Sequence, residues 1–163
     1  MPRTHLNRNA VRATLGVLLG VALCVGVSCR TPAPLPPFDL STADWKVLQG
    51  QAVWKPPHSR LEIAGDLLIA TRPGGDMLVQ FSKTPFPLVT ARVSGGVWEI
   101  EFGTEQRHWR APGRPPSRFG WFQLPEALAA GAARGDWRFE GQGASWKFSN
   151  PKTGEELEGE LSP

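Results

Sequence analysis

Apolar and polar side chains alternate with a period of two along most of residues 60–102. This period is typical of β-strands that bury one face and expose the other. Two glycine-containing turns, residues 73–76 and 94–96, interrupt the alternation, and turns this short connect antiparallel hairpins. The apolar positions are Leu61, Ile63, Leu67, Ile69, Met77, Val79, Phe81, Trp98, Ile100 and Phe102. The pattern predicts a single curved antiparallel sheet with one apolar face that must be covered.

Two short helices are predicted where this alternation stops, after Pro115 and Pro116. Ser117 can cap a helix that runs to Phe122, and residues 124–131 suit a second helix with proline in its first turn and glycine at its end. Strands then return until the C-terminus. The expected fold class is mainly β (α+β). Either the sheet closes into a barrel, or it stays a half-barrel or open barrel with short helices covering its concave face.

Residues 1–28 have the character of an export signal that ends before a cysteine. The segment starts with three arginines and no acidic residue, and its apolar run is shorter than the roughly 20 residues that a membrane-spanning helix needs. Gly26-Val27-Ser28-Cys29 resembles the lipobox, at which acyl chains are attached to the cysteine and the chain is cut before it. We therefore expect a lipoprotein signal peptide over 1–28 and lipidation of Cys29. The alternative is an ordinary secretory signal in which Cys29 has no role.

A proline-rich segment, 29–43, follows and predicts an extended linker to one domain spanning 44–163. In the alternative, Phe38 and Leu40 already pack on the domain. Arg30 stands where an aspartate would mark retention in the inner membrane. The expected localisation is the cell envelope, lipid-anchored at the periplasmic face of the outer membrane.

Charge excludes one class of partner. Of the 18 lysines and arginines three lie in the signal, so 15 basic and 15 acidic side chains remain after it. A net charge of zero gives no basic patch for a nucleic acid. Cys24 and Cys29 are the only cysteines, so no disulfide is expected once the signal is removed.

The residues also resemble a known family. The lipoprotein start, the hairpin meander and the segment Trp121-Phe122-Gln123-Leu124-Pro125 are similar to the lipoprotein-localisation factors LolA and LolB. In that family helices cover an open half-barrel, and an apolar cavity between them holds the acyl chains of lipoproteins in transit. The resemblance implies such a cavity here, with membrane lipid or lipoprotein acyl chains as its ligand and a periplasmic carrier protein as a partner.

A short loop carries a second part of the resemblance. LolB presents an apolar side chain to the membrane from a loop between two strands, and Thr84-Pro85-Phe86-Pro87-Leu88 occupies that place here. The resemblance implies that Pro85, Phe86 and Pro87 contact a membrane. The prolines fix their own φ and restrict the residues before them, so the loop is stiff. The alternative is that Phe86 folds back and caps the core.

No pattern in the sequence indicates catalysis, a metal or a cofactor. His58 and His108 lack the spacing of metal ligands, and His108 is expected at the surface. Glu99 and Glu101 share one strand face, which is best explained as solvated, and the glutamates between residues 155 and 160 are best explained as solubilising. We therefore expect a protein that is not an enzyme.

Two functions remain open. The first is a membrane-anchored envelope lipoprotein that binds lipid or lipoprotein acyl chains in an apolar cavity. One role of such a protein is the localisation of lipoproteins to the outer membrane. The cavity would be lined by Leu61, Ile63, Leu67, Ile69, Met77, Val79, Phe81, Trp98, Ile100, Phe102, Trp121 and Phe122. The second is a structural or protein-interaction lipoprotein with the same sheet and a filled core. The seven tryptophans fit both, as core packing or as a wide apolar surface for lipid.

Overall fold

The computed structural model describes residues 35, 37–103 and 105–162. Leu35–Pro163 form one compact unit. The predicted signal peptide, Cys29 and the first residues of the predicted linker lie outside the described residues.

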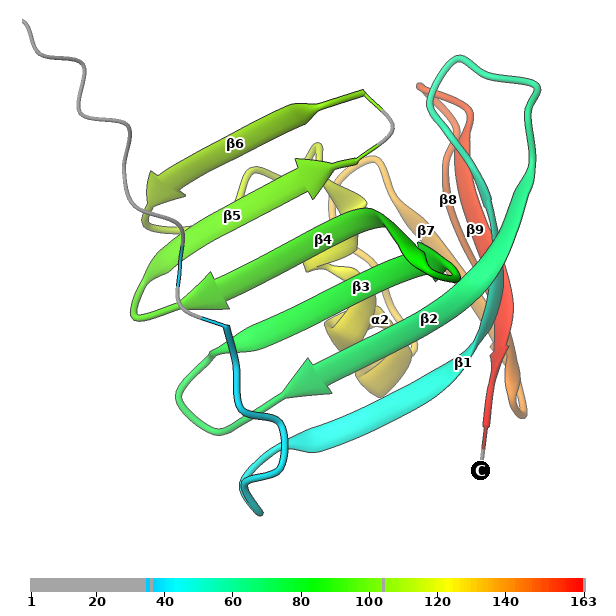
Figure 1. Cartoon of the computed structure of the whole chain (residues 1–163). Coiled ribbons are helices and arrows are strands. Elements are labelled where there is room, and N and C mark those ends of the chain that lie inside the picture. Colours follow the sequence, from blue (N-terminus) through cyan, green and yellow to red (C-terminus); the bar gives the residue numbers. More distant parts are fainter. Residues whose placement is uncertain (1–34, 36, 104, 163) are drawn as a thin grey trace, which may run out of the picture. The chain divides into compact units, whose positions relative to one another are not determined.

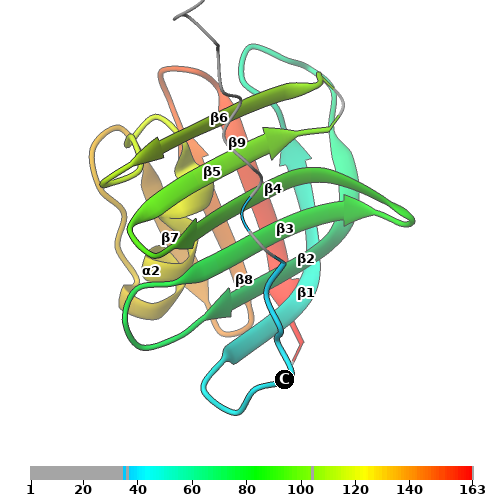
Figure 2. The same ribbon diagram turned by 60° about the vertical axis from the view of Figure 1, so that its left-hand side comes forward.

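One open antiparallel sheet makes up most of the unit (Figures 1 and 2). Its spatial order is β6-β5-β4-β3-β2-β1-β9-β8-β7, so β9, the last strand of the chain, pairs with β1, the first. The strands are β1 (Lys46–Lys55), β2 (Ile63–Thr71), β3 (Met77–Lys83), β4 (Phe86–Ser94), β5 (Val97–Phe102), β6 (Arg107–Pro112), β7 (Arg138–Gln142), β8 (Ser145–Asn150) and β9 (Glu155–Leu161). Since β6 and β7 form the two edges, the sheet is not closed. The predicted mainly β half-barrel is confirmed.

The predicted glycine turns form the hairpins. Gly95 and Gly96 have φ values of 56° and 75° and connect β4 to β5. A two-residue turn of this kind requires positive φ at both positions, which glycine adopts without steric cost. The turn fixes the register in which Ser94 faces Val97 and Ala91 faces Ile100. Val89, Ala91 and Val93 of β4 therefore fall on the same side of the sheet as their partners Phe102, Ile100 and Trp98 of β5.

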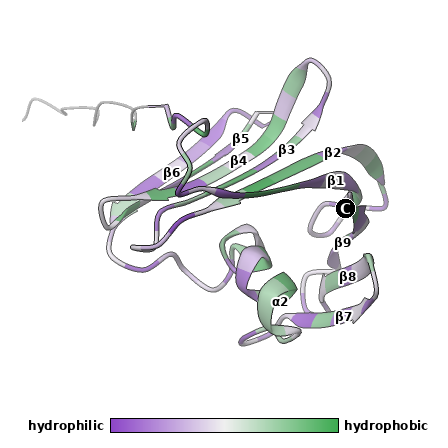
Figure 3. Ribbon diagram, turned by 90° about the horizontal axis from the view of Figure 1, so that it is seen from below, coloured by the Kyte–Doolittle hydropathy of each residue, from purple (hydrophilic) through white to green (hydrophobic). Residues whose placement is uncertain are grey.

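The helical insertion is shorter than predicted at its start. It consists of a 3-10 turn, η1 (Gly120–Phe122), and a helix, α2 (Leu124–Ala130), which ends at Gly131 in the left-handed conformation. Ser117 caps no helix, because η1 begins only at Gly120 and has Phe119 at its N-cap. The Ser117 carbonyl instead accepts hydrogen bonds from Trp137 Nε1 and Gln123 Nε2, both at 2.9 Å. The α2 helix lies on the concave side of the sheet, where β7 and β8 curl back (Figure 3).

The end of the predicted linker packs on the domain. The centroids of the Phe38 and Trp45 rings lie 4.9 Å apart. The guanidinium of Arg72 lies over the Trp45 ring, 5.1 Å from its centroid. Arg72 also pairs with Asp44 at 3.6 Å. These contacts agree with the alternative in which Phe38 belongs to the packed unit, which begins before Asp44.

Candidate functional site

The candidate site is the interior between the sheet and the segment η1–α2, which we call the lid. Trp121 of η1 is fully buried at its centre. Its ring centroid lies 5.5 Å from that of Trp54 on β1 and 5.9 Å from that of Phe81 on β3. Leu124 and Ala127 of α2 are buried in the same cluster. Contacts at these distances are the offset and edge-to-face arrangements that aromatic rings favour.

The structure brings eleven of the twelve predicted cavity residues into or against this core. Seven are buried in it: Leu67, Ile69, Val79, Phe81, Trp98, Ile100 and Trp121. Four are partly buried and pack against it: Ile63, Met77, Phe102 and Phe122. The sequence alternation therefore identified the inner face of the sheet correctly. Whether this face lines a cavity for a ligand stays a prediction.

Leu61 is the exception, and its placement in the interior is wrong. Its side chain is 62% exposed. It has the same phase as Ile63, but β2 begins only at Ile63, and residues 56–62 form the loop before it. The hydroxyl of Ser59 accepts a hydrogen bond from the Leu61 backbone N–H at 3.0 Å and holds the loop in a turn. The alternation in the sequence therefore extends past the start of β2, and outside the strand it does not predict which side chains are buried.

Aromatic side chains occupy the space beneath the lid. A second group of rings, from β5, β6 and the residues around η1, has centroid separations between 5.5 and 6.4 Å. Its members are Trp98, Phe102, Trp109, Phe119 and Phe122. Together with the buried centre they form a packed core in this conformation. An acyl chain would enter only if the lid and some of these rings moved.

A buried carboxyl at the edge of this core was missed by the sequence analysis. Glu155 is 6% exposed, and its Oε1 accepts a hydrogen bond from Trp54 Nε1 at 3.2 Å. Burial raises the pKa of Glu155 to about 7, although the Trp54 and Trp121 indoles oppose the shift. The contact with Trp121 is the weaker one, because its geometry falls short of a full hydrogen bond. Glu155 is in phase with buried Leu157, which is the signal that could have separated it from the exposed glutamates around it.

Glu99 is also buried, so its interpretation as a solvated side chain is wrong. Its Oε2 accepts hydrogen bonds from Arg92, with Nε and Nη2 both at 2.8 Å, and its Oε1 lies 2.6 Å from His108 Nε2. Burial alone would raise the pKa of Glu99, but the hydrogen bond from His108 and the charge of Arg92 outweigh it and lower the pKa. Glu101 is exposed and His108 is half exposed, as expected. These three side chains cross-link β4, β5 and β6.

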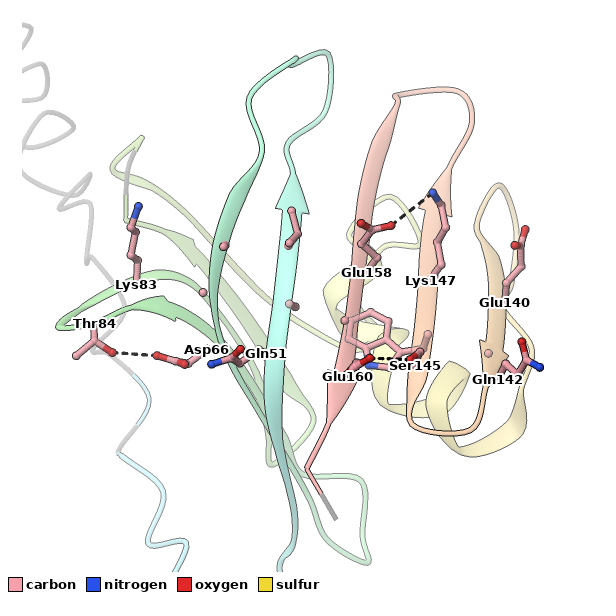
Figure 4. A pocket seen from close by; sticks show the side chains of 17 residues that line it. Gln51, Asp66, Lys83, Thr84, Glu140, Gln142, Ser145, Lys147, Glu158 and Glu160 are labelled. Carbon is pink, nitrogen blue, oxygen red and sulfur yellow. Dashed lines mark hydrogen bonds and ion pairs between the residues drawn. The ribbon is translucent and has the colours of Figure 1, made fainter.

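A groove of about 970 Å³ lies apart from the predicted cavity residues (Figure 4). It crosses six adjacent strands at one level, because Gly65 faces Ala52, Ala52 faces Gly159, and Gly159 faces Trp146. Its charged side chains are Asp66, Lys83, Glu140, Lys147, Glu158 and Glu160. Several of them pair with neighbours: Lys147 with Glu158 at 3.8 Å, Asp66 with Thr84 at 3.0 Å, and Glu160 with Ser145 at 2.9 Å. The lining also includes the apolar residues Ala52, Val53, Ala64 and Trp146.

The tip of the β3–β4 hairpin carries the most exposed large apolar side chain of the described residues. Phe86 is 70% exposed, and residues 83–87 are all exposed. Only Thr84 and Pro85 separate the two strands, and Phe86 pairs with Lys83. Phe86 therefore does not cap the core, and that alternative is wrong. Its contact with a membrane stays a prediction.

The described residues contain neither a metal site nor a membrane-spanning helix. No group of three or more His, Cys, Asp or Glu side chains in this part of the chain is arranged to hold a metal ion. Nor does this part contain a helix that is long and apolar enough to cross a membrane. No family model and no curated protein sequence matches the chain, so its relation to the localisation factors rests on the resemblance alone.

Proposed function

We propose that the protein is a lipid-anchored envelope lipoprotein whose domain binds lipid, with the hairpin tip at Phe86 meeting the membrane and the lidded interior receiving acyl chains of lipid or lipoproteins. The observation that carries the proposal is the 70% exposure of Phe86 on a short hairpin tip. Its partners would be membrane lipid, lipoprotein acyl chains and a periplasmic carrier protein. No catalytic step is part of the proposal.

The hairpin tip is suited to a membrane surface. An aromatic side chain that water surrounds on a rigid loop gains roughly 1.5 to 3 kcal/mol when it is fully buried in an apolar phase. Lys83 is exposed beside it and would attract anionic lipid, which contributes roughly 1 kcal/mol per cation near such a surface. These increments are small, so the tip would orient the domain on the membrane while the acyl chains on Cys29 provide the attachment.

The interior supports the second part of the proposal through its composition. A lid of one 3-10 turn and one helix of seven residues covers a face made of aliphatic and aromatic side chains. An acyl chain that replaces the lid on this face exchanges one apolar contact for another. Each methylene transferred from water contributes roughly 0.8 kcal/mol, so the exchange from a membrane can be nearly balanced and reversible. Uptake then requires displacement of the lid.

A second candidate is a structural or protein-interaction lipoprotein. The observation that favours it is the packing of Trp121 among Trp54 and Phe81, which leaves the centre of the interior occupied in this conformation. In that case the lid is simply part of the core. The two candidates differ in whether lipid other than the anchor accompanies the protein.

Phe86→Glu tests the membrane contact. In a chain of residues 30–163, which lacks both the predicted signal and Cys29 so that no anchor contributes, we expect Phe86→Glu to leave the melting temperature within about 2 °C, because an exposed side chain contributes little to folding. Its binding to vesicles of phosphatidylethanolamine and phosphatidylglycerol should fall roughly tenfold or more, which corresponds to the lost burial of the ring. Co-sedimentation at increasing lipid concentration measures the effect.

Val47→Glu is the matched control. Val47 is 38% exposed and pairs with Ala70, at the end of the β1–β2 hairpin opposite to its loop and therefore far along the sheet from the β3–β4 tip. Val47→Glu adds the same charge far from the proposed contact, where the surface potential has decayed, so vesicle binding should change by no more than about twofold. Equal losses for the two variants, or none for Phe86→Glu, would contradict membrane contact through this tip.

A further inference from the structure

The Glu155 carboxyl lies where the lid meets the sheet. It is held from β9 against the indole N–H of Trp54 on β1 at 3.2 Å. The Trp54 ring in turn meets the edge of Trp121, the buried residue of η1, with centroids 5.5 Å apart. The carboxyl, the two indoles and the lid therefore form one continuous contact from β9 to η1.

No charge that the structure shows beside this carboxyl balances it. Lys147 of β8 pairs with Glu156 and Glu158, and Lys152 of the β8–β9 turn pairs with Asp136. Lys55 of β1 follows Trp54 and so faces the other side of the sheet. Within the lid η1 has no charged residue, and Glu126 of α2 is exposed and pairs with Arg134. An ionised carboxylate in such a place is costly, whereas its protonated form can stay in contact with the rings.

We propose that Glu155 is a proton-dependent latch for the lid. With its proton bound, the carboxyl tolerates the dry contact with Trp54 and Trp121, and the lid stays on the sheet. When the proton leaves to bulk water, the carboxylate is more stable in contact with water, so the population of the state with η1 and α2 displaced rises. This inference rests on the proposed function, because displacement of the lid is the step that would admit an acyl chain.

The direction of the pH dependence follows from the shifted proton affinity. Burial raises the pKa of Glu155 to about 7 from an ordinary value near 4.5, the value expected once the carboxyl is hydrated. Glu155 therefore binds its proton more tightly when the lid is closed than when it is open. Raising the pH favours opening, and one carboxyl with these two pKa values, lid closed and lid open, gives at least roughly fifty-fold more opening at about pH 8 than at about pH 5.

Hydrogen exchange of the lid tests the latch in the full chain carrying Cys29→Ala. Amide protection factors of residues 117–131, corrected for the intrinsic pH dependence of exchange, should fall roughly fifty-fold from about pH 5 to about pH 8. Residues of β3 and β4, which exchange only when the whole domain unfolds, should stay better protected than the lid at every pH. In Glu155→Gln, which retains the shape but cannot ionise, lid protection should be independent of pH.

Three outcomes would overturn the latch. They are pH-independent lid protection in the unaltered Glu155 chain, the same pH dependence in Glu155→Gln, and lid protection equal to that of β3 and β4 at every pH. The last result would mean that the lid opens only when the whole domain unfolds. Trp121→Phe serves as a second variant, because it keeps a ring in the core and removes an N–H that lowers the pKa of Glu155. It should therefore increase the change of lid protection with pH, and a smaller change would count against the latch. Lipid binding is read separately from vesicles, so failure of the carrier function would leave these exchange results standing.

Discussion

Trp121→Ala should lower the free energy of unfolding by about 3 to 5 kcal/mol, the range for truncating a buried large aromatic side chain. Trp121 is among the largest fully buried side chains and meets both Trp54 and Phe81. Its removal takes away apolar burial and leaves a cavity between lid and sheet that neighbouring rings fill only in part. Urea unfolding followed by circular dichroism measures the loss.

Phe122→Ala is the matched control for this change. Phe122 is the next residue of η1, but it is only partly buried against Trp98 and Phe119. We expect a clearly smaller loss of stability than for Trp121→Ala, since less area leaves water when its ring packs. A loss below about 1 kcal/mol for Trp121→Ala would contradict a tightly packed interior and would indicate free space around the ring.

The second large effect is a decrease in stability of about 3 kcal/mol as the pH rises from about 4.5 to about 7, which follows from a shift of about 2.5 pKa units at Glu155. Between these pH values the unfolded chain has lost the Glu155 proton and the folded chain still holds it. The folded state therefore binds more protons, and raising the pH favours unfolding. The contribution is fully present below about pH 4.5 and is lost once the pH passes about 7.

Glu155→Gln should remove this dependence, and Glu158→Gln should not. Glu158 is an exposed glutamate on the same strand, so its substitution makes the same chemical change without burial. Denaturant midpoints between pH 4.5 and pH 8 measure the difference, about 3 kcal/mol at the two ends of the range. If Glu155→Gln and the unaltered chain follow the same pH curve, Glu155 is not a buried protonated group.

The sheet could be predicted because its signals are local. Alternation in β2, β3 and β5 places Leu67, Phe81 and Ile100 on the inner face, and Gly95 and Gly96 impose a hairpin that fixes register. The pairing of β9 with β1 joins residues about a hundred positions apart, and no local pattern specifies it. The exclusion of a closed barrel is likewise a property of the whole sheet, set by where its edges end.

The two glutamates that prediction placed at the surface were misplaced because burial depends on distant partners. Glu99 and Glu155 have the same side chain as their exposed neighbours, and only Arg92, His108 and Trp54 make their burial tolerable. Ser117 has the composition of a helix cap, but η1 begins only at Gly120, and Trp137, twenty residues away, donates to the Ser117 carbonyl. Phe86 was expected either outside or inside, and the two-residue turn of its hairpin leaves it outside.

Native mass spectrometry of the protein extracted from its own membrane tests the central proposal most directly. We expect a chain that begins at Cys29, carries covalent acyl groups, and retains further lipid that dissociates on collisional activation. A mass that contains the chain and its covalent anchor alone, under conditions where a known lipid carrier keeps its cargo, would contradict lipid binding by the interior and leave the structural lipoprotein as the function.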